Sequence, residues 1–283
     1  MKARSVFLAI VRSPLIPAIV LAALVLSALF APFIAPYSPT KTNLAHAMQP
    51  PFFQEGGSLA FPLGTDKVGR DILSRVIYGG QGSLMLAFWV LLIGGTTGTV
   101  LGLISGYMAG RIDNLIQRAA EAILSLPTIM VALVFVFVIG QSFTSVVLIL
   151  SPFIAARFAR MVRGDALTIR AMNYVSLARV AGASHLRIIF HHILPNVAGT
   201  LIVITTLEVG ALILVETSLS FLGVGVPPPT PAWGLMVADG REYLATKYWL
   251  TLFPGLAIVL TVLSVNWIGD WLRDILDPKR KHL

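Results

Sequence analysis

Two acidic residues, Glu208 and Glu216, lie inside the apolar stretch 197–219. A carboxylate in hydrocarbon is costly, so such an acid normally faces the interior of a helix bundle or an aqueous path. Glu208 is near the middle of the stretch and is the better candidate for lining a path, with a purely structural hydrogen bond as the alternative. Glu216 is a second path-lining candidate, and solvation at the end of the stretch is its alternative.

Sequence patterns that perform catalysis or bind a metal are absent. There is no G-x-x-x-x-G-K-[ST] phosphate loop, no G-x-S-x-G turn and no H-E-x-x-H pair. His185, His191 and His192 are not spaced to converge on one face of a helix, and the chain has no cysteine. We therefore expect no catalytic residue, no metal site and no cofactor held by this chain, ATP included. It is predicted not to be an enzyme.

The composition excludes a soluble protein. Apolar residues make up 56% of the 283 residues and charged residues 12%, against about 45–50% and about 25% in soluble domains. The excess of Lys and Arg, 21 against 13 Asp and Glu, could suggest nucleic acid, but the basic residues lie between long apolar blocks. They are better interpreted as signals of orientation in a lipid membrane, and no nucleic-acid partner is expected.

Stretches without charge predict six membrane-spanning helices, because crossing the hydrocarbon takes about 20 apolar residues. The predicted spans are 14–35, 83–107, 117–139, 143–163, 197–219 and 249–270. The predicted fold class is an all-α integral membrane protein in two parts. Residues 1–82 form an N-terminal anchor helix and an external amphipathic segment, and residues 83–283 form a five-helix core.

The distribution of Lys and Arg predicts the orientation of the spans. With both termini in the cytoplasm, 15 of the 21 basic residues lie on the cytoplasmic side, as the positive-inside rule requires. Residues 36–82 and 223–248 are then external, and 164–195 is cytoplasmic. The first apolar stretch is longer than a signal-peptide core and holds Pro14 and Pro17, so it is interpreted as an anchor.

The second predicted span has glycine at every fourth position. These glycines are Gly94, Gly98, Gly102, Gly106 and Gly110. A stripe of small residues lets another helix approach closely, so this span is expected to pack inside the bundle.

Two external segments could contact partners or form a gate. In the first, Asp66 is expected to cap an amphipathic helix on the outer interface in which Val68, Ile72 and Val76 share a face; a plain connector is the alternative. In the second, the prolines of 227–231 stiffen the chain, and Trp233 suits the headgroup layer. This segment could cap an opening or contact a partner, and an inert turn is the alternative.

The cytoplasmic segment 164–195 predicts two short helices joined at a glycine corner. Asn173 can cap a helix over 174–181 that Gly182 ends, and Ser184 can cap the next helix. The second helix would share an apolar face made of Leu186, Ile189, Phe190 and Ile193. Pro195 suits the first turn of the following span. Docking into a groove of another protein and an ordinary interfacial helix are both open.

Residues 174–184 and 192–196 resemble the coupling loop of ABC-importer permeases, written E-A-A, three residues, G, nine residues, I-x-L-P. The residues at motif positions are Ala178, Gly182, Leu194 and Pro195. Ser176 replaces the motif's Glu, Leu177 its first Ala and His192 its Ile. Residues 63–71, 218–223, 228–234 and 269–279 resemble the dipeptide/oligopeptide/nickel permease group, and within it the C-type, second permease. Trp271 stands where that group usually has Gly.

The resemblance implies an ABC importer type I permease with six transmembrane helices and a cytoplasmic coupling-helix loop between helices 4 and 5. It implies a bacterial cytoplasmic (inner) membrane importer for short peptides with a second homologous permease, two cytoplasmic ATPases that carry ATP and Mg, and an extracytoplasmic substrate-binding protein. Nickel chelates, glutathione or opines are alternative substrates. An ion-coupled secondary transporter is the alternative from another class.

The resemblance also assigns roles to residues of this chain. The expected ATPase-coupling residues are Tyr174, Ser176, Ala178, Arg179, Gly182, Ala183, Ser184, Leu194 and Pro195. The expected external gate or partner-contact residues are Asp66, Arg70, Asp71, Pro229 and Trp233.

Overall fold

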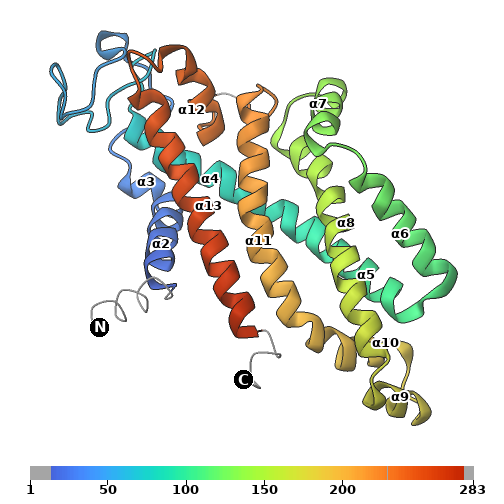
Figure 1. The fold of residues 1–283 in the computed structure, drawn as a ribbon. Coiled ribbons are helices and arrows are strands. Elements are labelled where there is room, and N and C mark those ends of the chain that lie inside the picture. The colour runs from blue at the N-terminus through green and yellow to red at the C-terminus, as the bar shows by residue number, and fades with distance from the viewer. Residues whose placement is uncertain (1–13, 228, 277–283) are drawn as a thin grey trace, which may run out of the picture. The chain divides into compact units, whose positions relative to one another are not determined.

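The computed structural model describes residues 14–227 and 229–276, and these are helical apart from their connecting loops (Figure 1). Within them the only β pairing is an isolated bridge between Thr65 and Asp71. The charged termini, predicted to be cytoplasmic, and Pro228 of the external proline motif lie outside the described residues. The all-α prediction is confirmed for the described chain.

The helices follow one another without any intervening sheet. In chain order they are α2 (Leu15–Leu29), α3 (Ala31–Ile34), η1 (Leu44–His46), α4 (Ile72–Val90), η2 (Leu91–Gly95), α5 (Thr96–Met108), α6 (Gly110–Leu124), α7 (Thr128–Ile139), α8 (Phe143–Arg170), α9 (Asn173–Val180), α10 (His185–Ile188), η3 (Ile189–Ile193), α11 (Leu194–Phe221), α12 (Trp233–Gly240), η4 (Arg241–Tyr243) and α13 (Trp249–Leu276). Both η2 and η3 are π-helical turns that continue the flanking α-helices.

The described chain has fewer complete spans than the six predicted. Four helices are long and apolar enough to cross a membrane: Ile72–Met108, Phe143–Arg170, His185–Phe221 and Trp249–Leu276. The α6–α7 pair makes a fifth if it is one span, although it bends by 82°. Pro127 sits at that bend, where it restricts the preceding residue and lacks a backbone donor. The predicted first span is covered by α2, a shorter apolar helix of 15 residues, and by α3.

The helix that starts at Ile72 differs from its prediction. We expected an interfacial helix capped by Asp66 and then a separate span, but α4, η2 and α5 run continuously from Ile72 to Met108. The capping residue is Asp71, whose carboxylate accepts the backbone N–H of Ser74 at 2.8 Å. Asp66 lies in the preceding loop, where its own backbone N–H donates to the Arg70 carbonyl at 3.0 Å. The assignment of Asp66 as a helix cap is therefore wrong.

The described chain forms two compact units, each with its own core. One comprises residues 14–87, 135–146 and 209–268. Its core packs Ile72, Ile213, Trp233 and Trp249 together, and Trp233 is 2% exposed. The Trp233 indole donates to the Val76 carbonyl at 2.8 Å, and a Cβ on Gly79 would lie 2.8 Å from its ring. Trp233 is therefore buried within the chain and not exposed as expected of a side chain in the headgroup layer, because glycines on α4 leave room for its ring.

The other unit comprises residues 88–134, 147–208 and 269–276, and it contains the glycine stripe. A Cβ on Gly98 would lie 2.3 Å from the Ala155 carbonyl oxygen, and one on Gly102 would lie 2.7 Å from that of Ala159. Gly94 and Gly106 meet α8 in the same way. Each glycine therefore receives a backbone carbonyl of α8, which confirms the predicted close packing for these four. Gly110 is the exception, since it has no atom within 4 Å of its would-be Cβ and begins α6 with φ +68°.

Candidate functional site

A glycine corner joins α9 to α10. Gly182 has φ +82°, its N–H donates to the Arg179 carbonyl at 3.1 Å, and the Ala183 N–H donates to that of Ala178 at 3.0 Å. These two bonds form a Schellman motif, which ends a helix with a left-handed residue. The Ser184 hydroxyl then accepts the Arg187 N–H at 3.3 Å and caps α10, as predicted. Met172, not Asn173, precedes α9, and no side chain caps it, so the predicted Asn173 cap is wrong.

The apolar face predicted for the second helix is only partly correct. Ile188 and Ile193 are fully buried, whereas Leu186 and Phe190 are 67% and 58% exposed. The π-helical turn η3 inserts a residue before Ile193, so Ile193 is buried together with Ile188, five positions earlier, and not on the face of Leu186. The sequence period of 3.6 residues cannot reveal such an insertion.

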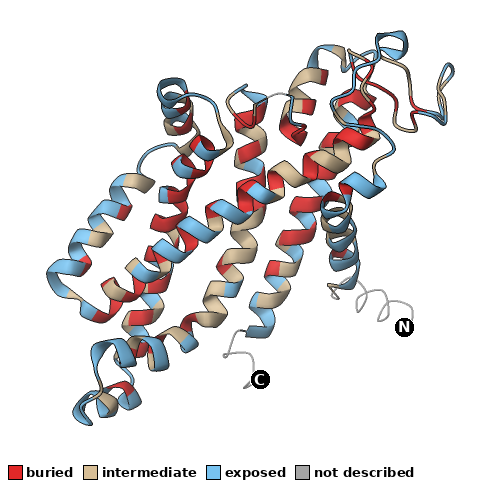
Figure 2. Cartoon of the chain, turned by 180° about the vertical axis from the view of Figure 1, so that it is seen from behind, coloured by how far each residue is buried: buried red, intermediate tan, exposed pale blue. Residues whose placement is uncertain are grey.

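Four large apolar side chains are exposed at the corner. Leu177 and Val180 on α9 are 69% and 88% exposed, and Leu186 and Phe190 extend the set to α10 and η3. Each pair has helical spacing, so each short segment displays two apolar groups on one side. We call Leu177, Val180, Leu186 and Phe190 the coupling surface. Most of the residues around it are exposed as well (Figure 2).

One buried tyrosine holds both arms of the corner. Tyr107, near the end of α5, is 4% exposed, and its hydroxyl lies 2.8 Å from Nδ1 of His185 on α10. The guanidinium carbon of Arg179 on α9 lies 5.7 Å from the centre of its ring. The corner is therefore fixed to α5 from two directions. Sequence reasoning missed Tyr107, because 78 residues separate it from His185.

The predicted coupling residues are all found in or next to this corner. Ser176, Arg179, Gly182, Ser184 and Pro195 are exposed, while Ala178, Ala183 and Leu194 are partly buried. Tyr174 is 39% exposed, and its hydroxyl accepts a hydrogen bond from the Asn196 amide at 3.2 Å. Backbone geometry thus brings together residues that the motif spreads over 22 positions.

The two glutamates of α11 have different surroundings. Glu208 accepts a hydrogen bond from the Arg157 guanidinium at 2.8 Å, and its side chain is 13% exposed against 38% for Arg157. Glu216 is 0% exposed and accepts hydrogen bonds from the hydroxyls of Ser83 at 2.9 Å and Ser220 at 2.7 Å. Solvation of Glu216 at the helix end is therefore wrong. Sequence reasoning also missed Arg157, although an arginine inside the predicted span 143–163 calls for an acidic partner.

The expected external contact residues Asp66, Arg70 and Asp71 form a cluster that is largely buried within the chain. The Asp66 carboxylate accepts the backbone N–H of Val68 at 3.0 Å and of Arg70 at 2.9 Å, and it pairs with the Arg70 side chain at 2.6 Å and with Arg75. Burial raises the pKa of Asp66, but the Arg75 charge and the interactions with Arg70 outweigh it and bring the pKa below the ordinary 3.8.

Asp71 has the opposite balance. Burial raises its pKa above 3.8, against hydrogen bonds from the Ser74 hydroxyl at 2.6 Å and the Ser74 backbone N–H at 2.8 Å. In the described part of the chain its Oδ1 has no hydrogen-bond partner, nor does Nε of Arg75. These two buried polar atoms without a partner are unfavourable, and they lie next to the ion pairs of Asp66 with Arg70 and Arg75.

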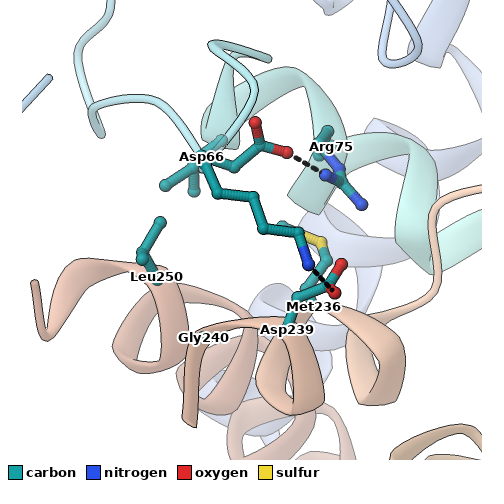
Figure 3. Close-up of a pocket in the computed structure, with 8 residues that line it drawn as sticks. Asp66, Arg75, Met236, Asp239, Gly240 and Leu250 are labelled. Carbon is teal, nitrogen blue, oxygen red and sulfur yellow. Dashed lines mark hydrogen bonds and ion pairs between the residues drawn. The ribbon is translucent and has the colours of Figure 1, made fainter. Parts of the chain in front are cut away.

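A second ion pair lies beside this cluster. Lys67 Nζ is 2.8 Å from an Asp239 carboxylate oxygen, and the two side chains are 44% and 32% exposed. With Asp66 and Arg75 they line a cavity of about 20 Å³, which is room for one water molecule (Figure 3). Of the remaining predicted contact residues, Pro229 is exposed and Trp233 is buried.

No group of three or more His, Cys, Asp or Glu side chains is arranged to hold a metal ion within residues 14–227 and 229–276. His185 is engaged with Tyr107, and a ring contact of 6.1 Å pairs His192 with Tyr174.

Comparison with known proteins identifies the family. A family model described as the binding-protein-dependent transport system inner membrane component matches residues 98–282. The chain belongs to this family. A second model, the N-terminal transmembrane domain of oligopeptide transport permease C, matches residues 14–51. The predicted resemblance to C-type permeases is confirmed.

Similar proteins support this assignment over most of the chain. The di/tripeptide transport system permease protein DppC of Pseudomonas aeruginosa is 40% identical over 92% of this chain and 86% of the relative. The dipeptide transport system permease protein DppC of Haemophilus influenzae is 40% identical over 96% and 92%. A glutathione transport system permease, GsiD of Pectobacterium atrosepticum, is 40% identical over 80% and 75%.

A chain of the MetNI methionine ABC transporter, solved in inward-facing conformations, shares the fold with a TM-score of 0.54. It is 18% identical, over 71% of this chain and 96% of that one, so the likeness shows the fold alone. This binding-protein-dependent component is thus a multi-pass inner-membrane permease subunit of an ABC importer, a class that works with an ATPase and a binding protein. The alternative of an ion-coupled secondary transporter is not supported.

Proposed function

We propose that this chain is one of two homologous permease subunits that carry short peptides into a bacterial cell. Two cytoplasmic ATPases bind ATP and Mg²⁺, this chain holds no cofactor, and an extracytoplasmic binding protein delivers the peptide. The substrate class rests on relatives named di/tripeptide and dipeptide permeases at 40% identity. The glutathione permease is itself named for a short peptide, so it extends the class.

The observation that carries the ATP-driven mechanism is the coupling surface. Four exposed apolar side chains at a corner fixed by Tyr107 are unfavourable in water, and they suit a groove of another protein. The motif residues Ala178 and Gly182 shape this corner through the Schellman bonds. When the ATPases close they would displace the corner, and the contacts of Tyr107 with His185 and Arg179 would transmit that displacement to α5.

We propose the orientation in which 164–195 and both termini are cytoplasmic, while 36–82 and 223–248 are external. It is supported by the positive-inside distribution, because most of the Lys and Arg residues outside the predicted spans then lie on the cytoplasmic side. In this arrangement 1–82 is the anchor and external part, and 83–283 is the core. Exposed Pro229 is then available to the binding protein, whereas Asp66, Arg70, Asp71 and Trp233 would shape that surface from inside.

Side-specific labelling tests this orientation. Thr246 and Ser184 are both exposed, so a cysteine at either position can react. In intact cells an impermeant maleimide should label Thr246→Cys and leave Ser184→Cys unlabelled until the membrane is opened. Labelling of Ser184→Cys alone would invert the orientation.

The coupling mechanism is tested at Gly182 with a matched pair of substitutions. A Cβ at Gly182 meets no atom within 4 Å, so only its φ of +82° opposes a side chain. Asn tolerates this conformation and a β-branched residue does not. In the complex reconstituted with its partners, Gly182→Val should lose peptide uptake together with peptide-stimulated ATP hydrolysis, and Gly182→Asn should keep both.

Membrane levels of the two variants should be equal. Loss of uptake in Gly182→Val with stimulated hydrolysis intact would place the defect in the path, and full activity of Gly182→Val would remove the coupling role of the corner.

A further inference from the structure

The Arg157–Glu208 pair joins two long helices that each contain a predicted membrane span. Arg157 is 14 residues after the start of α8 and 13 before its end, and Glu208 is 13 residues before the end of α11. Within the predicted spans 143–163 and 197–219, Arg157 lies six residues before the end of the first and Glu208 eleven residues after the start of the second, which is about 9 Å and about 16 Å along the helix axis. Both charges therefore lie inside predicted spans, and we treat the pair as intramembrane.

The pair is not enclosed by the chain that carries it. α8 is the most buried of the spanning helices, with 67% of its apolar segment buried, and Ala156 and Phe158 beside Arg157 are 4% and 2% exposed. Arg157 itself is nevertheless 38% exposed. Lipid is a poor environment for that surface, and intramembrane charges face a bundle interior or a water-filled path.

A second pair on α8 provides a contrast within the same unit. Arg163 binds Asp113 with two hydrogen bonds, Nε to Oδ1 at 2.5 Å and Nη2 to Oδ2 at 2.7 Å. Asp113 also accepts the Ser105 hydroxyl at 2.5 Å. Arg157 offers Glu208 one hydrogen bond, so part of its guanidinium donor set is free for another anion. Arg163 uses two of its donors within its ion pair and Arg157 uses one. The Arg157 pair is therefore the one that can exchange partners.

We propose that Arg157 and Glu208 together bind the two oppositely charged ends of a short peptide on its path through the membrane, an inference that rests on the proposed peptide import. We call this pair the station. A short peptide carries an ammonium at one end and a carboxylate at the other. As it passes, its carboxylate pairs with Arg157 and its ammonium with Glu208, so that charge contacts are exchanged and no charge is left unpaired in the membrane. Exposed Arg160, three residues along α8, adds positive charge on the Arg157 side.

The test compares uptake of three dipeptides that differ only in their terminal charges: Ala-Ala, N-acetyl-Ala-Ala, which lacks the ammonium, and Ala-Ala amide, which lacks the carboxylate. The same binding protein and ATPases are used with each permease variant, so a change in the ratio of rates reports this chain. Arg157→Gln removes the partner of the carboxylate and keeps that of the ammonium, so the ratio of Ala-Ala amide to N-acetyl-Ala-Ala uptake should rise by about tenfold. Glu208→Gln should lower the same ratio by about as much.

Two double variants keep the test decisive if a single variant fails to assemble. Arg157→Gln with Glu208→Gln can retain a hydrogen-bonded amide pair, so it should assemble with normal ATP hydrolysis while Ala-Ala uptake falls about tenfold. Arg163→Gln with Asp113→Asn removes the other charged pair of α8 and should leave the ratio of rates unchanged.

Opposite shifts of the ratio in the two single variants would support the station. Loss of uptake with an unchanged ratio, or full uptake in the Arg157/Glu208 double variant, would show that the pair is only structural and would overturn it. Failure of the unmodified complex to take up any of the dipeptides would instead overturn the proposed function.

Discussion

The loop around Asp66 buries charged side chains, whereas the corner around Gly182 exposes apolar side chains. In the Asp66 loop the charges are inside: Asp66 is 7% and Asp71 2% exposed, and each has partners within the chain. At the corner the apolar groups are outside, with Val180 88% exposed. Both segments keep a glycine with positive φ, Gly69 in one and Gly182 in the other. The first is completed by its own chain, and the second is the one that we propose to be completed by another protein.

The largest effect should follow from removing the buried charge of Asp66. Asp66→Asn leaves Arg75, whose side chain is 3% exposed, without its anion. Breaking a buried pair on one side costs about 3–5 kcal/mol of unfolding free energy. Thermal unfolding of the purified subunit should show the loss, and an unchanged midpoint would mean that the loop is held by its backbone bonds alone.

The pH dependence of stability should separate Asp66 from Asp71. The folded pKa of Asp66 is lowered, so its contribution is complete above the unfolded value near 3.8 and is lost as the pH falls through the folded pKa. The folded pKa of Asp71 is raised, so stability decreases as the pH rises from about 3.8 through its folded pKa.

Unfolding midpoints between pH 3 and pH 7 should therefore change in opposite directions for the two amide variants. The unfolding midpoint of Asp66→Asn should depend less on pH at the acidic end of this range. Asp71→Asn keeps a cap on α4, since Asn caps as well as Asp, and it should be neutral or stabilising at pH 7. Destabilisation of Asp71→Asn at pH 7 as large as that of Asp66→Asn would contradict the assigned pKa shifts.

The corner should respond to Tyr107 by a smaller amount. Tyr107→Phe keeps the ring under Arg179 and removes the hydrogen bond to His185, which is worth about 1 kcal/mol. Peptide-stimulated ATP hydrolysis should fall more than unfolding stability does. Asn196→Ala, which removes the bond to exposed Tyr174, is the matched control and should leave both nearly unchanged.

The exposed groups of both regions should contribute least to stability. Lys67→Met breaks a half-exposed ion pair with Asp239 and should cost about 0–1 kcal/mol, less at high salt. Val180→Ser should change the unfolding free energy by about 0.5 kcal/mol or less, yet reduce binding of the ATPase. Strong destabilisation by Val180→Ser would show that the coupling surface packs within this chain.

Sequence reasoning was most accurate where the determining contacts are local. Gly182 and Ser184 define a corner through bonds to residues three to five positions away, so the predicted helix, corner, helix order is confirmed. The glycine stripe was predicted from its spacing, and four of its five members meet α8. The family followed from the coupling-loop motif and the segments that accompany it, and the comparisons confirm it.

The errors of sequence reasoning have both distant and local causes. The π-helical turn η3 places Ile193 with buried Ile188 and not with Leu186 and Phe190. Glycines on α4 leave room for the buried ring of Trp233, which sequence reasoning assigned to the headgroup layer. Asp66 was predicted to cap a helix, but its carboxylate serves Arg75 instead. The burial of Trp233 depends on packing that a local window does not contain, whereas the Asp66 error is local, because its partners Arg70 and Arg75 lie within nine residues.

The sequence by itself determined the membrane class, the apolar spans, the glycine corner and the family, because these depend on composition, on spacing and on bonds between near neighbours. The tertiary structure alone decided which partners the two glutamates of α11 have: Arg157 pairs with Glu208 across 51 residues, and the Ser83 hydroxyl donates to Glu216 across 133. A charge in hydrocarbon must have a partner, but which partner it has depends on the helices that packing brings together.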